Sequence, residues 1–92
     1  MAIQYADTIT RYGLSLSAAY AVITHFSGDT TTVDYTIEIY VNQAAFLAGD
    51  VPVDSDGIRS QALSGLTLTS GFLHGLYLNM LTHSRYSGGS IV

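Results

Sequence analysis

The sequence predicts a small α+β domain with an antiparallel β-sheet, a long central hairpin, a short helical turn and one C-terminal helix. A length of 92 residues gives room for one core, so we expect residues 1–92 to fold as a single domain. Alternation of apolar and polar residues over 31–42 is typical of a half-buried strand. Apolar residues at helical spacing near the C-terminus are typical of a helix that packs on a sheet.

The central hairpin is predicted from two alternating segments, residues 14–26 and residues 31–42. In the first segment both alternating sets are partly apolar, so we expect both faces to be partly covered. The second segment is rich in β-branched residues and has one apolar face: Val33, Tyr35, Ile37, Ile39 and Val41. Between them, Ser27-Gly28-Asp29-Thr30 has the composition of a turn, which joins the two strands.

The chain after the hairpin predicts one or two helical turns over residues 43–48. Asn42 is the expected N-cap, and Gly49 is expected to end the turn in a left-handed conformation. An acidic loop over 50–58 follows. Renewed alternation over 61–69 then predicts a further strand.

The C-terminal helix is predicted over residues 71–84, after a capping serine. Its apolar stripe is wide enough to cover one face of the sheet: Phe72, Leu73, Leu76, Tyr77, Met80 and Leu81. A strand over 72–78 is the alternative, because Gly75 inside a helix costs about 1 kcal/mol relative to alanine. At the chain ends, residues 1–12 predict an extended arm or an edge strand. Residues 86–92 predict a flexible tail, unless Ile91 and Val92 dock on the fold.

The composition favours a protein that is covered by other proteins when it works. Apolar residues make up 48% of the chain and charged residues 11%, whereas about 25% charged is typical of soluble domains. The chain has no cysteine, which excludes disulfides and thiolate metal sites. Oligomerisation or docking on a larger body is the support that remains for so small a fold. We expect no cofactor.

The net charge of the chain limits the kinds of partner that we expect it to bind. A net charge of −4 argues against binding to nucleic acid and to anionic membranes. The most apolar stretch, residues 63–81, contains six polar residues and three glycines, so we do not expect it to span a membrane. Residues 1–4 lack the features of a signal peptide, and we therefore expect synthesis in a cytoplasm.

The acidic loop has a partial match to a calcium-binding loop. Asp54, Asp56 and Gly57 fit its third, fifth and sixth positions. However, the first position falls on Pro52, and the twelfth, which needs a bidentate glutamate, falls on Leu63. We therefore expect a solvated turn and no metal site, with Asp54 and Asp56 as the ligands that a calcium site would use.

Patterns that would indicate an enzyme are weak. His25, with Asp34 or Glu38 across the hairpin, has the groups for acid–base chemistry, but a cross-strand hydrogen bond explains the same pairing. His74 and His83 are nine residues apart, so on one helix they face opposite sides and cannot share a metal. The sequence has neither a nucleophile elbow nor a glycine-rich phosphate loop. We expect a non-enzymatic protein.

Seven tyrosines are spread over the chain, and tyrosine suits interfaces because it combines a large ring with one polar contact. Tyr40 lies on the otherwise polar face of the second hairpin strand. The interface candidates are Tyr20, Tyr40, Phe46 and Tyr86. Ordinary surface tyrosines are the alternative interpretation.

The order of parts resembles a group of phage proteins. The hairpin ends in Ile37-Glu38-Ile39-Tyr40-Val41-Asn42, an alanine-rich turn ends at Gly49, and the small acidic loop follows. The run Leu76-Tyr77-Leu78-Asn79-Met80-Leu81 then leads into a glycine-containing tail. Over residues 19–92 this order is similar to that of small virion-associated proteins of tailed bacteriophages. Here the turn is less charged than is usual in that group, and the C-terminal helix lacks the usual proline-aromatic ending.

The resemblance implies a component of the phage particle, made in the host cytoplasm and located in the virion. It would be a tail, neck, baseplate or fibre-attachment subunit, or else a capsid decoration protein. Its implied partners are other virion structural proteins and copies of itself, with strand addition at a sheet edge as the expected mode of contact. The alternative from another class is a small calcium- or ligand-binding module that uses residues 50–57.

Overall fold

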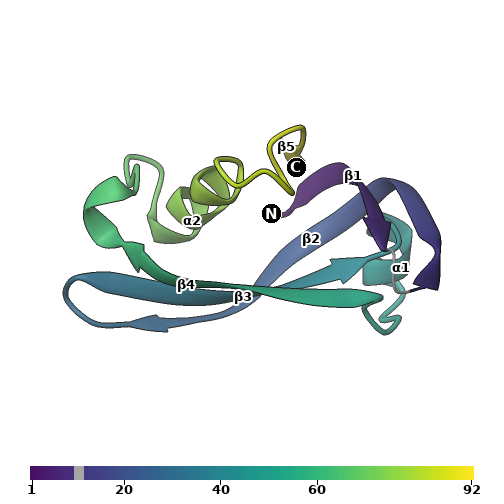
Figure 1. The fold of residues 1–92 in the computed structure, drawn as a ribbon, viewed down its shortest axis with the longest axis horizontal. Helices are drawn as coiled ribbons and strands as arrows, with labels where there is room; N and C mark the ends of the chain where they lie inside the picture. The colour runs from purple at the N-terminus through teal and green to yellow at the C-terminus, as the bar shows by residue number, and fades with distance from the viewer. Residues whose placement is uncertain (10–11) are drawn as a thin grey trace.

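The computed structural model describes residues 1–9 and 12–92, which form a five-stranded antiparallel sheet in the order β4-β3-β2-β1-β5 (Figure 1). The predicted α+β class with an antiparallel sheet is confirmed. The elements are β1 (Ile3–Ile9), β2 (Leu14–Gly28), β3 (Thr32–Tyr40), α1 (Gln43–Leu47), β4 (Asp54–Ala62), α2 (Phe72–Met80) and β5 (Ser90–Ile91), with a 3-10 turn at Leu63–Gly65.

Strands β2 and β3 pair along the length of the central hairpin, from Tyr20 opposite Tyr40 to Gly28 opposite Val33. One carboxylate holds the turn between them: Asp29 Oδ1 accepts the backbone N–H groups of Thr31 and Thr32 at 2.8 and 2.9 Å. A side chain at Gly28 would place its Cβ 2.3 Å from the Thr32 carbonyl oxygen. Only glycine fits there, which explains this residue at the start of the turn.

Two irregularities interrupt the regular pairing of β2 with its neighbours. The register shifts between Tyr5 and Asp7 on β1, which lie opposite Ala19 and Leu16, so β2 has one extra residue there. A second shift lies between Ile23 and His25. The first bulge brings four β2 residues into one core cluster although their numbers do not alternate: Leu16, Ala19, Ala21 and Ile23. Bulges also increase the twist and curl of the sheet.

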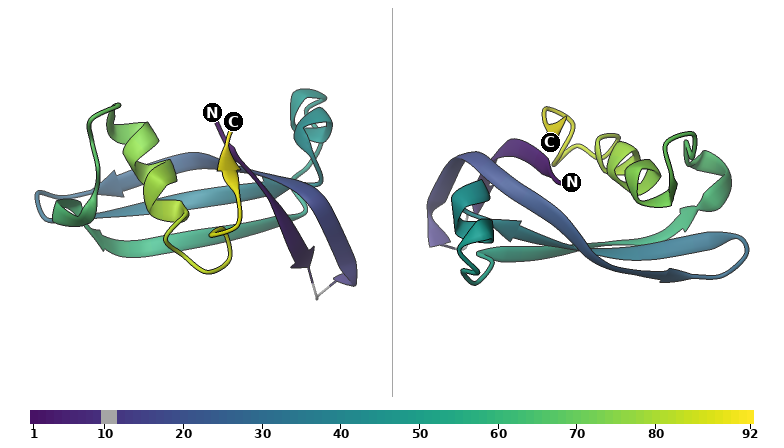
Figure 2. Two further views of the ribbon diagram at one scale, coloured as in Figure 1. Left: turned by 90° about the horizontal axis from the view of Figure 1, so that it is seen from above. Right: turned by 180° about the vertical axis from the view of Figure 1, so that it is seen from behind.

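The main core lies between one face of the sheet and a layer made of α2 and the C-terminal segment (Figure 2). Its largest fully buried side chains are Tyr35, Tyr77, Tyr86, Ile3, Ile37, Ile39, Leu76 and Met80. The buried hydroxyls have partners. Tyr35 donates to Asn79 Oδ1, and the Tyr77 hydroxyl accepts the N–H of Ile23 at 2.9 Å. Two predicted core residues are not buried: Val41 follows the end of β3, and Leu73 faces outward from α2.

The middle of the chain corrects the sequence prediction. Residues 54–62, within and beyond the predicted acidic loop, form strand β4, because they pair with β3 from Ile39 opposite Asp54 to Thr32 opposite Ala62. The strand predicted over 61–69 is wrong, since a 3-10 turn and irregular chain follow Ala62. This irregular chain packs on α2 so closely that a Cβ at Gly75 would lie 2.7 Å from the Thr67 carbonyl oxygen.

The C-terminal element is a helix, as predicted, but it is shorter than the predicted range of 71–84. Gly71, with φ of 101°, precedes its first residue, and α2 ends at Met80. The following residues form turns, with the N–H of Thr82 donating to the carbonyl of Asn79 at 3.0 Å. Those turns direct the rest of the chain back across the sheet.

Both chain ends pack into the sheet. Within the range 1–12, β1 lies between β2 and β5, while Thr10 and Arg11 fall outside the described residues. Of the two alternatives for residues 86–92, a flexible tail is wrong and docking of Ile91 and Val92 is confirmed, since Tyr86 is buried and β5 pairs with β1. The backbone groups of Ala2 and Val92 exchange hydrogen bonds of 3.0 and 2.8 Å. The two termini therefore lie side by side (Figure 2).

Candidate functional site

The C-terminal segment 82–92, termed the clasp below, connects two strands that are distant in the sheet order. Strands β1 and β4 are separated by β3 and β2, yet Arg85 of the clasp contacts carboxylates on both. Its NH2 atom lies 2.9 Å from Asp7 Oδ2 on β1 and 2.8 Å from Asp54 Oδ2 on β4. Its NH1 atom lies 3.8 Å from Asp56 Oδ2. The sheet is therefore curled enough for one guanidinium to span its two sides.

The Arg85 guanidinium is held as a permanent cation at this position. Partial burial by itself would lower its pKa, but the hydrogen bonds to Asp54 and Asp7 outweigh this and raise the pKa above its ordinary value. Its side chain is 30% exposed. The planar guanidinium suits the role because it offers several donors in fixed directions, which a lysine ammonium does not.

Two tyrosines complete the cluster. The rings of Tyr5 and Tyr86 meet edge to face, with centroids 5.1 Å apart. The Tyr5 hydroxyl donates to Asp7 Oδ2, and the Tyr86 hydroxyl donates to Asp56 Oδ2 at 2.7 Å. Burial, together with these bonds to carboxylates, raises the pKa of both tyrosines well above the ordinary value. The cluster thus combines contact between aromatic rings with hydrogen bonds to carboxylates.

The three aspartates of the cluster also bond to the backbone of the strands that carry them. Their Oδ1 atoms accept the N–H of the next residue, at 2.7 Å for Thr8, 2.9 Å for Ser55 and 2.8 Å for Gly57. On an edge strand, every second N–H points away from the neighbouring strand and is open to another chain. Ser55 and Gly57 are two residues apart on edge strand β4, as this alternation requires. Each aspartate therefore accepts a backbone N–H with its Oδ1 atom. Its Oδ2 atom accepts a hydrogen bond from a clasp side chain.

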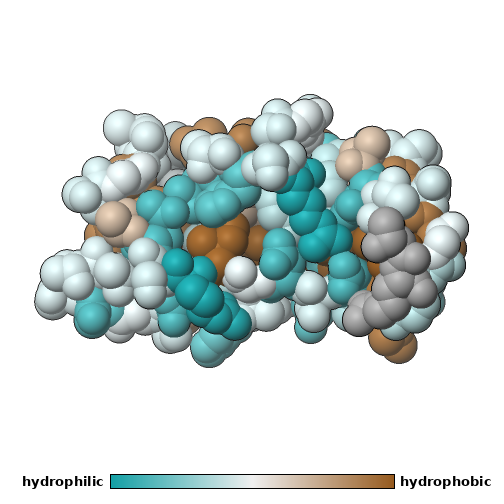
Figure 3. All heavy atoms as spheres, in the orientation of Figure 1, coloured by the Kyte–Doolittle hydropathy of each residue, from teal (hydrophilic) through white to brown (hydrophobic). Residues whose placement is uncertain are grey.

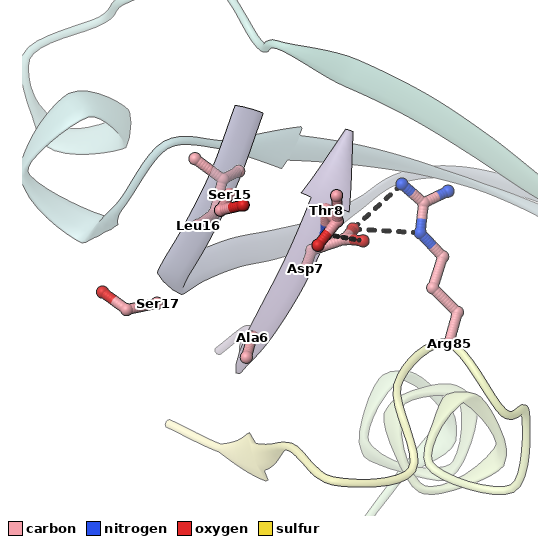
Figure 4. Close-up of a pocket in the computed structure, with 7 residues that line it drawn as sticks. All are labelled: Ala6, Asp7, Thr8, Ser15, Leu16, Ser17 and Arg85. Carbon is pink, nitrogen blue, oxygen red and sulfur yellow. Dashed lines mark hydrogen bonds and ion pairs between the residues drawn. The ribbon is translucent and has the colours of Figure 1, made fainter. Parts of the chain in front are cut away.

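Two hollows flank Arg85. The first, of about 430 Å³, is lined by β1, by β2 and by Arg85 itself (Figure 4). Figure 4 shows Asp7 and Arg85 pointing toward each other at its side. The second, of about 350 Å³, is lined by β4 and the clasp and includes Arg59 and His83. Both are open depressions beside the clasp rather than enclosed cavities.

The residues considered for calcium have a different role. Asp54 and Asp56 lie on strand β4 rather than in a loop, and their Oδ2 atoms bond to Arg85 and Tyr86. Over residues 1–9 and 12–92, no group of three or more histidine, aspartate or glutamate side chains is arranged to hold a metal ion. A cation would have to displace Arg85 to reach these carboxylates.

The four interface candidates divide between two places. Tyr20, Tyr40 and Phe46 gather on the opposite face of the sheet, where the Phe46 ring lies 5.3 Å from Tyr20 and 5.1 Å from Tyr40 between centroids. Tyr20 and Tyr40 are buried there with Ala2. Burial, with the bond from its hydroxyl to Glu38, raises the pKa of Tyr40. Tyr86, by contrast, belongs to the clasp, so none of the three tyrosines is a free surface ring.

The histidines lie apart from one another. His25 is exposed and pairs with Thr36 across the hairpin, whereas Asp34 lies opposite Ser27 and Glu38 opposite Val22. The expected pairing of His25 with a carboxylate is therefore wrong, because the register that runs from the turn places Thr36 opposite His25. His74 is on α2, and His83 lies at the second hollow.

Large apolar side chains are exposed at both ends of the long axis, which measures 38 Å. Near α1, Leu47 is 72% exposed and Val51 84% exposed. At the other end, the hairpin turn and the start of α2 form an apolar hollow of about 260 Å³ lined in part by Phe26 and Phe72. Figure 1 places α1 and the hairpin turn at opposite ends, and Figure 3 shows apolar atoms at the surface at the α1 end.

Comparisons with known proteins return nothing: no protein-family model, no curated protein and no solved structure matches the chain. In the described part of the chain, no helix is long and apolar enough to cross a membrane.

Three residues of this cluster, Arg85 in the clasp and Asp7 and Tyr5 on β1, were not identified from the sequence. Their contacts join residues as far as 78 positions apart, so no local pattern marks them. The one available signal is the small number of basic residues, because the sequence has three arginines and no lysine for seven acidic residues. A buried carboxylate in such a chain has few cations to pair with.

Proposed function

We propose that this protein is a non-enzymatic structural subunit of a phage particle, which acts through protein–protein contacts in a symmetric assembly. A tail, neck, baseplate or fibre-attachment position is proposed first, and a capsid decoration position second. The setting follows from the resemblance to virion-associated proteins. The partners are other virion proteins and copies of the same chain.

The observation that carries the proposal is the exposure of large apolar side chains at both ends of an elongated molecule. Leu47 and Val51 protrude near α1, and Phe26 borders a hollow at the hairpin end. Fully burying one such aliphatic side chain contributes roughly 1.5–3 kcal/mol. A subunit that meets neighbours at two different ends makes head-to-tail contacts, which produce rings or filaments.

The polar cluster supports a structural role over the alternative of a calcium-binding module. Asp54 and Asp56 are bonded to Arg85 and Tyr86 and are not directed into a ligand site. The clasp also changes the expected mode of contact. Since several edge N–H groups are occupied by aspartates, the apolar ends are the surfaces most available to neighbours while the clasp is closed.

The test is the solution mass of the protein by light scattering over a concentration series. We expect a discrete oligomer or growth into larger assemblies, and Leu47→Ser with Val51→Ser should weaken association at least about tenfold. Val92→Ser is the matched control, because Val92 is 52% exposed but the C-terminus lies at neither end of the long axis. A monomer at every concentration, or association that the end substitutions leave unchanged, would contradict the proposed self-contact.

The phage setting has its own test, since self-association alone does not establish it. The experiment purifies virions from a culture infected with a phage that encodes this protein. Mass spectrometry of those virions should find the protein in the particle at a fixed copy number. Its presence only in the cell lysate would contradict a virion component.

A further inference from the structure

We propose that the apolar hollow at the hairpin end binds an arginine side chain of a different protein, which lies against Phe26 and Phe72 and pairs with Asp29. The hollow has a volume of about 260 Å³ and is lined by the hairpin turn, the 3-10 turn and the start of α2. The inference rests on the proposed function, because it names the chemistry of the neighbour that one of the two apolar ends takes.

Two aromatic rings line the hollow. The ring centroids of Phe26 on β2 and Phe72 on α2 lie 5.2 Å apart, with the ring planes inclined at 56°. Val33 and Leu63 add aliphatic contact. Sites that enclose a drug-sized ligand usually have volumes of about 300–1,000 Å³, so this hollow suits a single side chain better than a free cofactor.

A fixed carboxylate lines the same hollow. Asp29 Oδ1 accepts the N–H and the hydroxyl of Thr31 at 2.8 and 2.9 Å, and the N–H of Thr32 at 2.9 Å. These bonds, that from the Thr31 backbone most of all, hold the pKa of Asp29 below its ordinary value, so the side chain is an anion at neutral pH. Because all three bonds go to Oδ1 of an exposed residue, Oδ2 is accessible to a donor from outside.

A side chain that covers this hollow has to suit both the rings and the carboxylate. A purely apolar side chain would take the Asp29 charge out of water without a partner, which is unfavourable. A cation over the face of an aromatic ring is attracted by the electrons of the ring. Arginine combines the two contacts, because its planar guanidinium is weakly hydrated, stacks on rings and donates to carboxylates.

The clasp contains this combination of groups within the chain. The Cζ atom of Arg85 lies 5.9 Å from the centroid of the Tyr86 ring, and its nitrogen atoms donate to Asp7 and Asp54. One arginine therefore contacts an aromatic ring and carboxylates at once. At the hairpin end the rings and the carboxylate are present, but none of the described arginines lines the hollow. The same contacts there need an arginine from outside the chain.

The charge of the chain favours a different protein over a second copy. With a net charge of −4, three arginines and no lysine, two copies repel each other and offer few cations. Arg85 is already paired with clasp carboxylates, and Arg59 donates to the Tyr35 carbonyl at 3.4 Å. The same negative charge attracts a basic partner, which speeds encounter and disfavours wrong partners. The arginine therefore belongs to a basic surface of another protein.

The test measures binding of a small arginine probe by nuclear magnetic resonance. Isotope-labelled protein is titrated with N-acetyl-arginine methylamide, and N-acetyl-citrulline methylamide is the neutral control of nearly the same shape. We expect saturable shifts of the backbone amide signals of Gly28, Asp29 and Thr32, with a dissociation constant of about 1–10 mM. Citrulline should bind at least about tenfold more weakly. Equal binding of the two probes, or no saturable shift at these amides, would overturn the proposal.

Variants separate the carboxylate from the rings, and their amide spectra report whether they are folded. Asp29→Asn removes the charge but keeps an Oδ1 acceptor for the turn, and Asp50→Asn is the matched control at an exposed position near α1. Asp29→Asn should weaken binding of the arginine probe about two- to fivefold, and Asp50→Asn should leave it unchanged. Phe26→Leu keeps an apolar side chain without a ring and should weaken binding about two- to fivefold. Wild-type binding in Asp29→Asn or Phe26→Leu contradicts the assigned contacts.

The outcomes for the two proposals are separable. Specific binding of the arginine probe by a protein that stays monomeric in light scattering supports the hollow and contradicts the proposed self-contact. Self-association that Leu47→Ser/Val51→Ser weakens, without specific probe binding, supports the self-contact and removes the arginine site. Self-association that Asp29→Asn weakens overturns the choice of a different protein, since the arginine then comes from a second copy.

Discussion

The clasp and the tip of the central hairpin satisfy their polar groups in opposite ways. In the clasp, Arg85 and Tyr86 bond to strands that lie 30 or more positions earlier in the chain. At the tip, where residues 24–31 are all exposed, Asp29 bonds to residues two and three positions away. The clasp therefore holds distant parts of the fold together, whereas the tip holds only its own turn.

The difference indicates where stability and adaptability lie. Loss of a clasp contact leaves groups in a partly buried site without partners, which is costly, while loss of a tip contact exposes groups to water that can replace it. A neighbour can therefore cover the tip without disturbing the core.

Replacing a clasp aromatic should cost far more than replacing a tip aromatic. Tyr86 is 1% exposed, so Tyr86→Ala should lower the free energy of unfolding by about 3–5 kcal/mol. Phe26 is 48% exposed, so Phe26→Ala should lower it by about 1 kcal/mol. Urea unfolding monitored by circular dichroism measures both. Equal losses would remove the contrast between the two regions.

Adjacent glycines of the clasp offer a matched pair. A Cβ at Gly89 would lie 2.7 Å from Ile3 Cγ2 and 3.0 Å from the Gln4 carbonyl oxygen, whereas a Cβ at Gly88 meets nothing within 4 Å. Gly89→Ala should therefore destabilise the protein by about 1–3 kcal/mol, because the clasp must shift away from β1. Gly88→Ala should change stability by no more than about 0.5 kcal/mol. Thermal unfolding of the two variants measures the difference in stability. A Gly89→Ala variant as stable as the wild type would mean that the clasp packs loosely on β1.

Alkaline pH should weaken the core and the clasp together. Burial, with nearby carboxylates, raises the pKa of Tyr5, Tyr35 and Tyr86 in the folded state. Their contribution is complete below the unfolded value of about pH 10, and it is lost above it, since the unfolded chain then releases protons that the folded chain keeps. Stability should fall by up to about 1.4 kcal/mol per pH unit for each tyrosine.

Unfolding in urea at a series of pH values around and above about pH 10 measures this slope. Tyr86→Phe keeps the ring but cannot ionise. The free energy of unfolding of this variant should therefore fall less steeply with pH, by the contribution of one tyrosine. A slope identical to that of the wild type would show that Tyr86 does not hold its proton in the folded state.

One substitution in β4 should stabilise the protein. Ser60 has a φ of 54°, a left-handed conformation that is unfavourable for a residue with a side chain, and its N–H donates to Asp34 Oδ1 at 2.7 Å. Ser60→Gly keeps this bond and should raise the free energy of unfolding by up to about 1 kcal/mol. Ser55→Gly, at a position of the same strand without a positive φ, should instead lower it by about 0.5–1 kcal/mol. Two changes of the same sign would contradict this account.

The parts of the fold that were predictable are those that depend on local pattern. The alternation through Val33, Tyr35, Ile37 and Ile39 predicts a strand with one buried face, and all four residues are buried. The spacing of Leu76, Tyr77 and Met80 predicts a helix on the sheet, and these residues belong to the core. In both elements the residues that determine the structure are neighbours in sequence.

The parts that were not predictable depend on distant partners. Asp54-Ser55-Asp56-Gly57 has the composition of a turn, and it becomes a strand because β3 pairs with it and Arg85 neutralises its carboxylates. The bulge of β2 between Leu16 and Ala19 shifts its core-facing residues out of simple alternation. Of the candidate site, only Asp54, Asp56 and Tyr86 were singled out from the sequence, and the contacts that they make in the cluster were not predicted.

The pairing of Ala2 with Val92 and of Ile3 with Ile91 also affects how the chain acquires its fold. The ribosome makes β1 at the start of this segment, but the partner that covers its edge emerges only after residue 91. Contacts so remote in sequence slow folding, because a long loop must close before they form. Until then the first strand is exposed to neighbouring nascent chains. Newly made copies on one messenger would therefore meet with their edges uncovered.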